Sequence, residues 1–341
     1  MITDSIKKIL YFIIFYISIF SFSQTFVVGA SLIGYKDMNR VTNVVKNLFY
    51  PILTLLYQEG FKSPIFYTGK YLKSDKIDII VANHLNALDL VIYLSVIRQY
   101  DDRNVYYIMK KGVTLVPGVG IVLSENNDIK LSRKLDEDEN ILKESLAKIT
   151  SGIIVIYPEG TRYSNQKQKE CVEYSKKNNL PIFNNVLYPK MKGLWIITNE
   201  LIRTNKMGNI IDFTMMIEKL KGKDGLLSTI LTQDFGNTYA HVNTYTIDTI
   251  DTIDTVDSYD NFKLWFLKIW EKKDKIMNTM GTLKDTNKYN NIKSTLKSSD
   301  YMLFILVTSL FIYMMVKSKG LYLPISLVFS YIIVIINNRK I

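Results

Sequence analysis

The residues of this chain best suited to chemistry are a histidine and an aspartate in one short stretch, Asn83-His84-Leu85-Asn86-Ala87-Leu88-Asp89. The stretch follows the apolar run 78–82 (DIIVA), and the whole chain has only two histidines. A carboxylate next to an imidazole holds the ring in one tautomer and favours its protonated form. A histidine oriented in this way can take a proton from an alcohol. We therefore predict that His84 and Asp89 are catalytic.

The spacing of these two residues is also compatible with a second interpretation, an ordinary polar helix start with an incidental histidine. A histidine and an aspartate at this spacing arise by chance often enough that the pattern alone is weak. We expect a helix to begin after the apolar run, with Asn83 as its cap and His84 and Asp89 on its first turns. The other histidine, His241, is most simply an exposed loop or strand residue.

A second motif, Tyr157-Pro158-Glu159-Gly160-Thr161-Arg162, favours the catalytic interpretation. It follows the apolar run 152–156 (GIIVI) and so lies at the carboxyl end of an expected strand, where α/β proteins build their sites. The guanidinium of an arginine can bind a phosphate through two parallel hydrogen bonds. The neighbouring glutamate could hold that arginine or the loop in place. The candidate substrate-binding residues here are Glu159, Gly160, Thr161 and Arg162.

Apolar, β-branched runs recur along the middle of the chain, at 78–82, 105–109, 152–157 and 212–218. Helical patterns lie between them, and the segment 136–150 has apolar residues at helical spacing. Acidic residues crowd the start of that segment, as the helix dipole favours. Strands that alternate with helices predict an α/β sheet with its site at the strand ends.

The membrane interpretation rests on the two ends of the chain. No charged residue occurs from Ile9 to Tyr35, and about 20 apolar residues are enough to cross a bilayer. Lys7 and Lys8 precede this run, so a signal peptide is conceivable. The apolar core of a signal peptide needs only about 7 to 15 residues, however, and the longer run favours an anchor that stays uncleaved.

Two further apolar runs, 301–316 and 321–336, flank a short turn near the other end of the chain. Each is slightly short for a span, and Pro324 would kink the second, so we expect a tight helical hairpin that spans or dips into the bilayer. A pair of buried core helices is the alternative. The predicted division is an N-terminal membrane anchor at 1–39, a mixed, charged central domain at 40–290 and a C-terminal hydrophobic helical hairpin at 299–341.

Charge and cysteine content narrow the class of protein. A formal net charge of +11 suggests anionic partners, namely phosphate-bearing ligands, a membrane surface or nucleic acid. The apolar ends and the lack of a basic-aromatic module speak against nucleic acid. The single cysteine, Cys171, excludes an internal disulfide framework. The repeat at 246–257 (TIDTIDTIDTVD) lacks the glycine and terminal glutamate of a calcium loop, so we expect an exposed loop and no metal site there.

Together the two motifs resemble a known family, the glycerolipid acyltransferases, which include 1-acylglycerol-3-phosphate acyltransferase and the lysocardiolipin-type enzymes. Members of that family carry an Asn-His-x4-Asp block followed by a (Phe/Tyr)-Pro-Glu-Gly-Thr-Arg block. Both blocks stand in this chain in the same order. The resemblance implies an α/β acyltransferase-type domain with a mixed sheet flanked by helices, next to a membrane.

Further blocks extend the resemblance from about residue 78 to 280. The segment 110–120 (KKGVTLVPGVG) is similar to the family's Lys-Lys…Ile-Pro-Gly-x-Gly segment, and Arg133 falls in the Ile-x-Leu-x-Arg position that follows it. The segment 186–193 (VLYPKMKG) resembles a Val-Leu-x-Pro-(Arg/Lys)-Thr-Lys-Gly block, and 262–274 resembles a Trp-x4-(Trp/Phe)-x-Glu-Lys-Asp block. Leu90 and Ile121 depart from the family, which often has aromatic residues there, and this leaves acyl-chain and head-group preference open.

The resemblance implies a reaction in which a lysophospholipid hydroxyl attacks the thioester of acyl-CoA. His84 would be the general base and Asp89 would orient it, while Arg162 would hold the acceptor's phosphate. Lys111 and Arg133 would help with that phosphate or with those of CoA. Acyl-CoA is a co-substrate in this scheme, and we expect no cofactor, no metal and no protein nucleophile. Loop amides near Gly118 or Gly160 are the candidates for stabilising the oxyanion.

Three alternatives remain open at this point. The acceptor is expected to be lysophosphatidic acid, giving phosphatidic acid, but lysocardiolipin or lysophosphatidylinositol would fit the same motifs. A non-catalytic lipid-binding membrane protein is a third alternative, although such a protein would be expected to have lost His84, Asp89 or Arg162. The expected partners are the lysophospholipid, acyl-CoA and membrane lipids. We expect an integral membrane protein of the endoplasmic reticulum with its catalytic domain facing the cytosol, where acyl-CoA is found.

Overall fold

A computed structural model describes residues 19–116, 119–132, 135–219, 235–246, 258–280 and 289–292, together with single residues and short pieces near both ends. The chain forms two compact units. Unit 1 comprises Met1–Leu56, Ile108–Ile141 and Ser294–Ile341, and unit 2 comprises Tyr57–Tyr107 and Leu142–Lys293. The boundaries at 39, 290 and 299 proposed for an anchor, a central domain and a hairpin stay predictions.

Unit 2 is built on a sheet whose centre is parallel. Strand β2 (Ile77–Ala82) lies between β5 (Gly152–Ile156) and β6 (Met207–Ile217) and pairs with both in parallel. Strand β3 (Val105–Lys110) pairs in parallel with the outer side of β5 through its first residues. Every residue of β2 and β5 is buried, which is why these strands, apart from Asp78 in β2, are continuous apolar runs in the sequence rather than alternating ones.

The other half of the sheet makes it a mixed one. Strand β7 (Thr238–Tyr245) pairs with β6 in antiparallel orientation and with β1 (Ile65–Gly69) in parallel, and β8 (Asn290–Ile292) closes this edge in antiparallel orientation. The order within unit 2 is β3-β5-β2-β6-β7-β1-β8. The predicted α/β fold with a mixed sheet flanked by helices is thereby confirmed. His241 lies on β7, where its Nδ1 is 2.9 Å from Thr68 Oγ1 and burial lowers its pKa.

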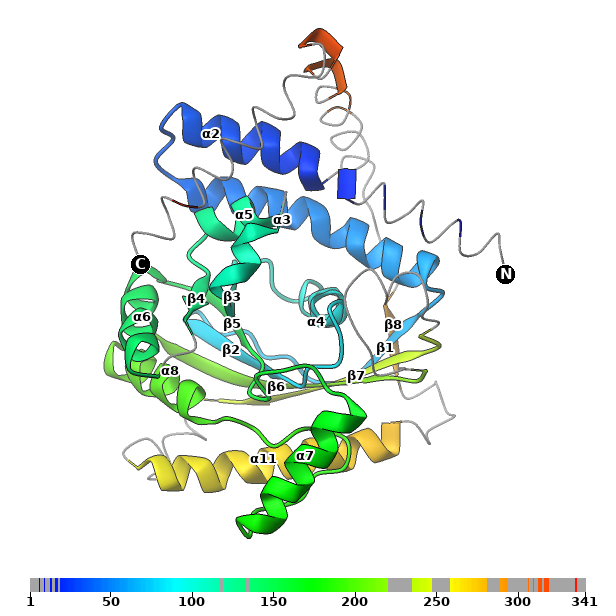
Figure 1. Ribbon diagram of the computed structural model, residues 1–341, viewed down its shortest axis with the longest axis vertical. Helices are drawn as coiled ribbons and strands as arrows, with labels where there is room; N and C mark the ends of the chain where they lie inside the picture. Colours follow the sequence, from blue (N-terminus) through cyan, green and yellow to red (C-terminus); the bar gives the residue numbers. More distant parts are fainter. Residues whose placement is uncertain are drawn as a thin grey trace. The chain divides into compact units, whose positions relative to one another are not determined.

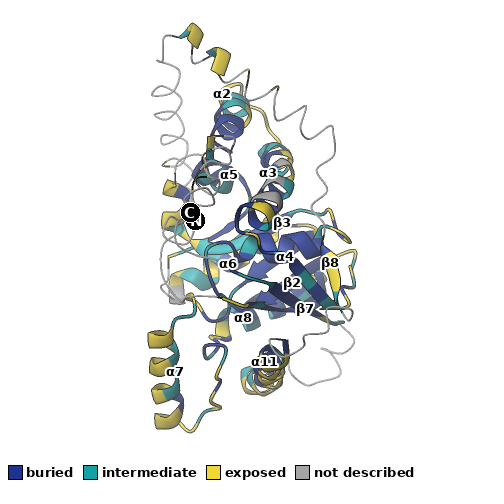
Figure 2. Ribbon diagram, turned by 90° about the vertical axis from the view of Figure 1, so that its right-hand side faces the viewer, coloured by how far each residue is buried: buried dark blue, intermediate teal, exposed yellow. Residues whose placement is uncertain are grey.

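Helices cover both faces of this sheet (Figures 1 and 2). Helix α4 (Asp89–Ile97) lies on one face and is buried on nearly all sides. Helices α8 (Lys192–Arg203) and α11 (Tyr259–Met280) lie on the other face, against β6. Helix α7 (Asn165–Lys177) follows β5 and is largely exposed. The inner side of α11 carries buried residues at helical spacing: Phe262, Phe266, Ile269, Trp270, Lys273, Met277 and Met280.

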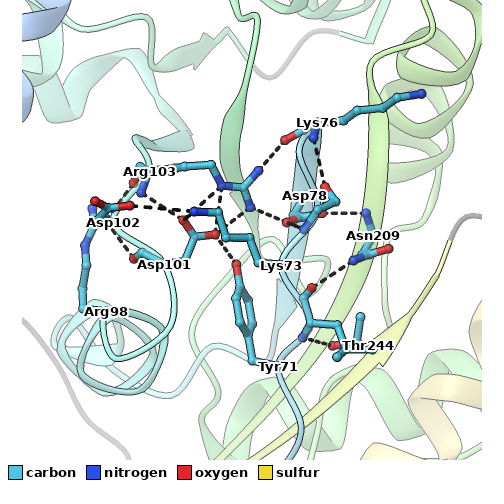
Figure 3. A network of polar contacts seen from close by, with 12 residues as sticks. Tyr71, Lys73, Lys76, Asp78, Arg98, Asp101, Asp102, Arg103, Asn209 and Thr244 are labelled. Carbon is cyan, nitrogen blue, oxygen red and sulfur yellow. Dashed lines mark hydrogen bonds and ion pairs between the residues drawn. The ribbon is translucent and has the colours of Figure 1, made fainter.

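A network of charged side chains fastens the amino end of β2 (Figure 3). Arg103 donates to both carboxylate oxygens of Asp101 at 3.0 Å through Nε and to Asp78 at 2.5 Å through Nη2. Tyr71 donates its hydroxyl to Asp101 at 2.6 Å. Burial acts to raise the pKa of Asp101, but the hydrogen bonds from Arg103 and Tyr71 hold that pKa below its ordinary value. This network lies at the end of β2 opposite to His84 and therefore stabilises the fold rather than the site.

The described part of unit 1 is mostly helical. A π-helical segment (Ser23–Val28) leads into α2 (Gly29–Leu32), and α3 (Met38–Leu55) follows, then a second π-helical segment (Leu56–Gly60) that leads into unit 2. A 3-10 helix (Lys111–Leu115), α5 (Val119–Glu125) and β4 (Ile129–Leu131) form its middle part, and β4 pairs in parallel with the end of β3. Helix α6 (Leu135–Lys148) leads from unit 1 into unit 2, as expected for the segment 136–150.

The described core of unit 1 is apolar and contains a buried ion pair. Its buried cluster comprises Ile19, Phe22, Val27, Val28, Val45, Phe49, Ile121 and Val122. Lys46 Nζ lies 3.1 Å from Asp128 Oδ2, and both side chains are buried. No helix among the described residues combines the length and the apolar character needed to cross a membrane. Most of 1–18, nearly all of the hairpin predicted at 299–341 and the repeat from 247 onwards lie outside the described residues.

Candidate active site

His84 and Asp89 form a hydrogen-bonded pair at the carboxyl end of β2. His84 Nδ1 lies 2.8 Å from Asp89 Oδ2. The same carboxylate accepts hydrogen bonds from the backbone N–H of Leu85 at 2.7 Å and of Asn86 at 3.0 Å. The His84 side chain is 24% exposed while that of Asp89 is 1% exposed. Asp89 therefore presents a fixed negative charge to Nδ1, and the other ring nitrogen, Nε2, is the one left to accept a proton.

The segment between these two residues is a tight turn and not the first turns of a helix. Helix α4 begins at Asp89, and the expectation of a helix that begins near Asn83 is wrong. The turn is closed by Asn86 Oδ1, which accepts from the Leu88 N–H at 2.6 Å. Histidine and aspartate meet because the Asp89 side chain folds back onto the amides that precede its own helix, as acceptors at helix starts do.

Asn83 ties this turn to the neighbouring strand instead of capping a helix. Its Nδ2 donates to the Met215 carbonyl at 2.9 Å, and its Oδ1 accepts from the Met215 N–H at 2.8 Å. Met215 lies on β6, so the asparagine side chain imitates one further backbone pair of the sheet. The partner is distant in sequence, and the local pattern gave no signal of it.

The Tyr157–Arg162 motif lies beside the His84 turn because β5 and β2 are parallel neighbours. The Tyr157 ring stacks on the His84 ring with centroids 4.2 Å apart and planes inclined by 24°. The Tyr163 N–H donates to the His84 carbonyl at 2.7 Å. Burial raises the pKa of Tyr157 well above its ordinary value, and the negative charge of Asp89 adds to the effect. Both motifs were predicted to lie at the ends of strands, and the structure shows that they meet there.

Glu159 is an internal brace between three loops. Its Oε2 accepts from the His84 N–H at 3.3 Å and its Oε1 from the Leu187 N–H at 3.4 Å, and the residue is 3% exposed. Burial raises the pKa of Glu159 well above its ordinary value, although the two backbone donors and the nearby Lys273 act to lower it. Of the two roles considered for this glutamate, holding the arginine or holding the loop, these contacts fit the second.

The next three residues of the motif, Gly160, Thr161 and Arg162, are exposed. Gly160 has a φ of +66°, a left-handed conformation that a glycine adopts without strain. Its N–H donates to the Tyr157 carbonyl at 3.0 Å, so this amide closes the turn and is not available to an oxyanion. The turn thus leaves Arg162 exposed on the loop whose next residue, Tyr163, bonds to His84.

Lys190 is a further basic residue of this loop cluster, and sequence reasoning gave it no role. Its backbone N–H donates to the Pro158 carbonyl at 2.7 Å. Its side chain passes over Gly160: a Cβ built on that glycine would lie 3.4 Å from Lys190 Cδ and 3.7 Å from Nζ. The block 186–193 had pointed to this segment, but only the fold brings it to the Glu159 turn.

The remaining predicted site residues are placed as follows. Lys111 opens the 3-10 helix of unit 1 and is partly exposed. Arg133 and Gly118 lie outside the described residues. Cys171 is on α7 and is partly buried. Within the described part of the chain, no group of three or more histidine, cysteine or acidic residues is arranged to hold a metal ion.

Comparison with known proteins agrees with this geometry. The family model for acyltransferases matches residues 64–218, which include both motifs and Lys190. Residues 64–218 of this chain form an acyltransferase-family domain. Its similarity to 1-acyl-sn-glycerol-3-phosphate acyltransferase 2 of Arabidopsis thaliana is 26% identity over 193 residues, 54% of this chain and 49% of the relative. Its similarity to lysocardiolipin acyltransferase 1 of Mus musculus is 23% identity over 277 residues, 78% of this chain and 72% of the relative.

Two further comparisons describe how far the likeness extends beyond this acyltransferase domain. A probable 1-acyl-sn-glycerol-3-phosphate acyltransferase 5 of Arabidopsis thaliana is 24% identical over 151 residues, and these cover 43% of this chain and 40% of the relative. The chain thus spans less than half the length of these plant relatives. The crystal structure of the acyltransferase PlsC from Thermotoga maritima superposes with a TM-score of 0.47 at 16% identity, covering 83% of this chain and 98% of that one.

Proposed function

We propose that this protein is a membrane-bound acyltransferase that moves an acyl chain from acyl-CoA to the free hydroxyl of a lysophospholipid. The observation that carries the proposal is the His84–Asp89 pair, 2.8 Å apart, beside two adjoining loops that expose Arg162 and Lys190. A base for the hydroxyl and positive charge for a phosphate thus occur within one set of connected loops. Because these groups lie in the region that matches the acyltransferase family model, acyl transfer is the chemistry they are expected to perform.

The steps follow from the geometry of the pair. His84 Nε2 takes the proton of the acceptor hydroxyl while the hydroxyl oxygen forms a bond to the thioester carbonyl carbon. The tetrahedral intermediate then collapses, the carbon–sulfur bond breaks, and the imidazolium returns the proton to the departing CoA sulfur. Asp89 holds Nδ1–H and stabilises the imidazolium between these two steps. The free hydroxyl attacks directly, so no acyl-enzyme intermediate is formed.

The exposed basic side chains supply the acceptor site. Arg162 can hold a phosphate through two parallel hydrogen bonds, and Lys190 adds a second positive charge next to Gly160. Helix α7 begins shortly after Arg162, at Asn165, and the amino end of a helix favours an anion. Thr161 offers a hydroxyl on the same loop. Lys111 and Arg133 are proposed to contact the phosphates of the acceptor or of CoA.

The acceptor is proposed to be lysophosphatidic acid, which would give phosphatidic acid. Support comes from relatives named 1-acyl-sn-glycerol-3-phosphate acyltransferases, while another relative is named lysocardiolipin acyltransferase and keeps that lysolipid as the second candidate. Lysophosphatidylinositol is a third. Because both acceptor and product are lipids, we propose attachment to the endoplasmic reticulum membrane with the site facing the cytosol, the source of acyl-CoA.

The test is an acyl-transfer assay with the full-length chain in lipid nanodiscs. Labelled oleoyl-CoA is offered with lysophosphatidic acid, lysophosphatidylinositol or monolysocardiolipin, and products are separated by mass. We expect CoA release coupled to one acylated product, and loss of roughly 10²–10⁴-fold in rate for His84→Ala. A chain that binds these lysolipids but transfers no acyl group would be a lipid-binding protein, and the proposal would be wrong.

A further inference from the structure

Helix α11 lies on the face of the sheet opposite to α4, and from there it contacts the loops of the candidate site. Its buried residues Trp270, Lys273, Asp274 and Met277 lie at helical spacing and so share one side of the helix. Each of the four reaches a segment that carries or braces His84. Because α11 lies far along the chain from His84, only the tertiary structure brings this helix to the site.

Lys273 reaches the ends of the two central strands. Its side chain is fully buried, and Nζ donates to the Phe213 carbonyl at 2.8 Å and lies 3.4 Å from the Val81 carbonyl. Asp212 Oδ1 lies 2.5 Å from the same nitrogen. Val81 is opposite Asp212 in the parallel register of β2 and β6, so the ammonium group joins these strands just before β2 enters the His84 turn.

Asn83 and Lys273 therefore hold successive positions at the carboxyl end of β2. Asn83 pairs with Met215 on β6 immediately after the point that Lys273 holds. The Asn83 amide also lies 3.8 Å from the Met277 sulfur, so α11 contacts Asn83 as well. The backbone of β2 is thus fixed on both sides of Ala82, directly before the residue whose imidazole must meet the substrate.

A second path leads from α11 to the brace of the site. Trp270 Nε1 donates to the Leu187 carbonyl at 2.9 Å, and the Leu187 N–H donates to Glu159. Asp274 accepts from the Asn185 N–H at 2.6 Å and so holds the same segment. Glu159 in turn accepts from the His84 N–H. Both paths end at the His84 backbone, one through β2 and one through Glu159.

The charge of Lys273 fits this arrangement better than an apolar side chain would. Burial lowers the pKa of Lys273, and the adjacent Asp212 opposes that effect. Its ammonium lies 5.1 Å from the centre of the Trp270 ring and acts to lower the pKa of Glu159 against the effect of burial. A buried ion pair gains little stability over well-packed apolar residues. The three N–H donors of the Lys273 ammonium, however, hold β2, β6 and α11 in one geometry, which apolar contacts do not.

We propose that Lys273 is a positioning residue for His84: it locks the carboxyl ends of β2 and β6 to α11 and thereby sets the imidazole in its reactive place. The inference rests on the proposed acyl transfer for its kinetic readout only. A displacement of about 1 Å at a reacting group can lower a rate roughly 100-fold. Loss of Lys273 is therefore a loss in kcat, with the KM values of acceptor and donor nearly unchanged.

The decisive variant is Asp212→Asn/Lys273→Met in the full-length chain, because it removes both charges together and leaves no lone charge buried. The control is Lys272→Met, the same change at the neighbouring, exposed position. We expect a ten- to hundredfold lower kcat for the double variant, KM values within twofold of the parent, and parental kinetics for the control. A kcat within twofold of the parent in the folded double variant overturns the inference.

A spectroscopic readout separates positioning from simple stability. With only two histidines in the chain, ring-labelled histidine gives two sets of NMR signals, and His84→Ala identifies which set belongs to His84. We expect the Nδ1–H signal of His84 to shift or broaden in the double variant and to stay unchanged in Lys272→Met. A lower kcat with an unchanged His84 signal would show that Lys273 does not act through His84 and would overturn the inference.

Two further arms cover the ways in which the experiment can fail. If the double variant does not fold, Asp212→Asn/Lys273→Gln keeps a donor for the Phe213 carbonyl and is read by the same two measurements, with the same outcome overturning the inference. If the parent chain acylates no lysolipid, the proposed function is wrong. The His84 signals of parent, double variant and control then still decide whether Lys273 positions the imidazole.

Discussion

Replacing Asp89 by asparagine is expected to slow acyl transfer by roughly 10- to 150-fold while leaving His84 in place. The carboxylate accepts three hydrogen bonds: Oδ2 from His84 Nδ1 and the Leu85 N–H, and Oδ1 from the Asn86 N–H. An amide has one oxygen and one nitrogen, so it can replace only one of the two acceptors, Oδ1 or Oδ2. The structure decides which one it satisfies.

The amide oxygen is expected to take the place of Oδ2. In that orientation it keeps the bonds to His84 and Leu85 and sets the amide nitrogen against the Asn86 N–H, whereas the reverse orientation loses both acceptor bonds of Oδ2 and sets the nitrogen against the Leu85 N–H. The imidazole therefore keeps its tautomer and loses only the charge that stabilises its protonated form. A hydrogen bond to a charged group contributes about 1.5–3 kcal/mol, which is the roughly 10- to 150-fold loss in rate.

The assay is kcat for acyl transfer at saturating acyl-CoA and lysolipid, measured beside His84→Ala. Asp102→Asn is the matched control, because the side chain of Asp102 is 97% exposed and the chemical change is the same. A loss as large as that of His84→Ala would mean that the amide has reversed and the tautomer is wrong. A rate equal to the parent would mean that the imidazolium does not form, and the reasoning from the pair would be refuted.

Three other outcomes are expected. Arg162→Ala should raise the apparent KM for the lysolipid about ten- to hundredfold and Arg162→Lys less, with the KM for acyl-CoA unchanged; the reverse pattern would place Arg162 on the CoA side. The full-length chain should stay with membranes through high-salt and carbonate washes, since burial of apolar segments does not depend on ionic strength; release by salt alone would contradict the anchor. The free energy of unfolding should fall as the pH drops below about 4. The pKa of Asp101 is lower in the folded chain than in the unfolded chain, so its carboxylate stabilises the fold at pH values above the unfolded pKa, and this stability is lost when Asp101 is protonated. Asp101→Asn should weaken that acid dependence in denaturant titrations, and an unaltered dependence would exclude Asp101 as its source.

The sequence by itself predicted the parts of the site that local chemistry specifies. Apart from Asp78, the runs 78–82 and 152–156 are continuous and apolar because strands buried on both faces must be, and this placed His84 and the Tyr157–Arg162 motif at the carboxyl ends of two strands. Parallel strands bring their carboxyl ends to one edge, so both motifs were expected at that edge, whereas the pairing of β2 with β5 that makes them neighbours was decided by the fold. The pairing of His84 with Asp89 could also be predicted, because the two residues are close in sequence.

Contacts between residues far apart in sequence were decided by the tertiary structure alone. Asn83 was expected to cap a helix, but its amide pairs with Met215 on β6. Glu159 turned inward to brace the amides of His84 and Leu187, and Lys273 joined β2, β6 and α11 from the far side of the sheet. The physical reason is common to all three: a polar group that becomes buried must find a hydrogen-bonding partner, and the packing of the strands determines which partner is near. Residue types indicate that such partners are needed, whereas only the fold determines where the partners lie.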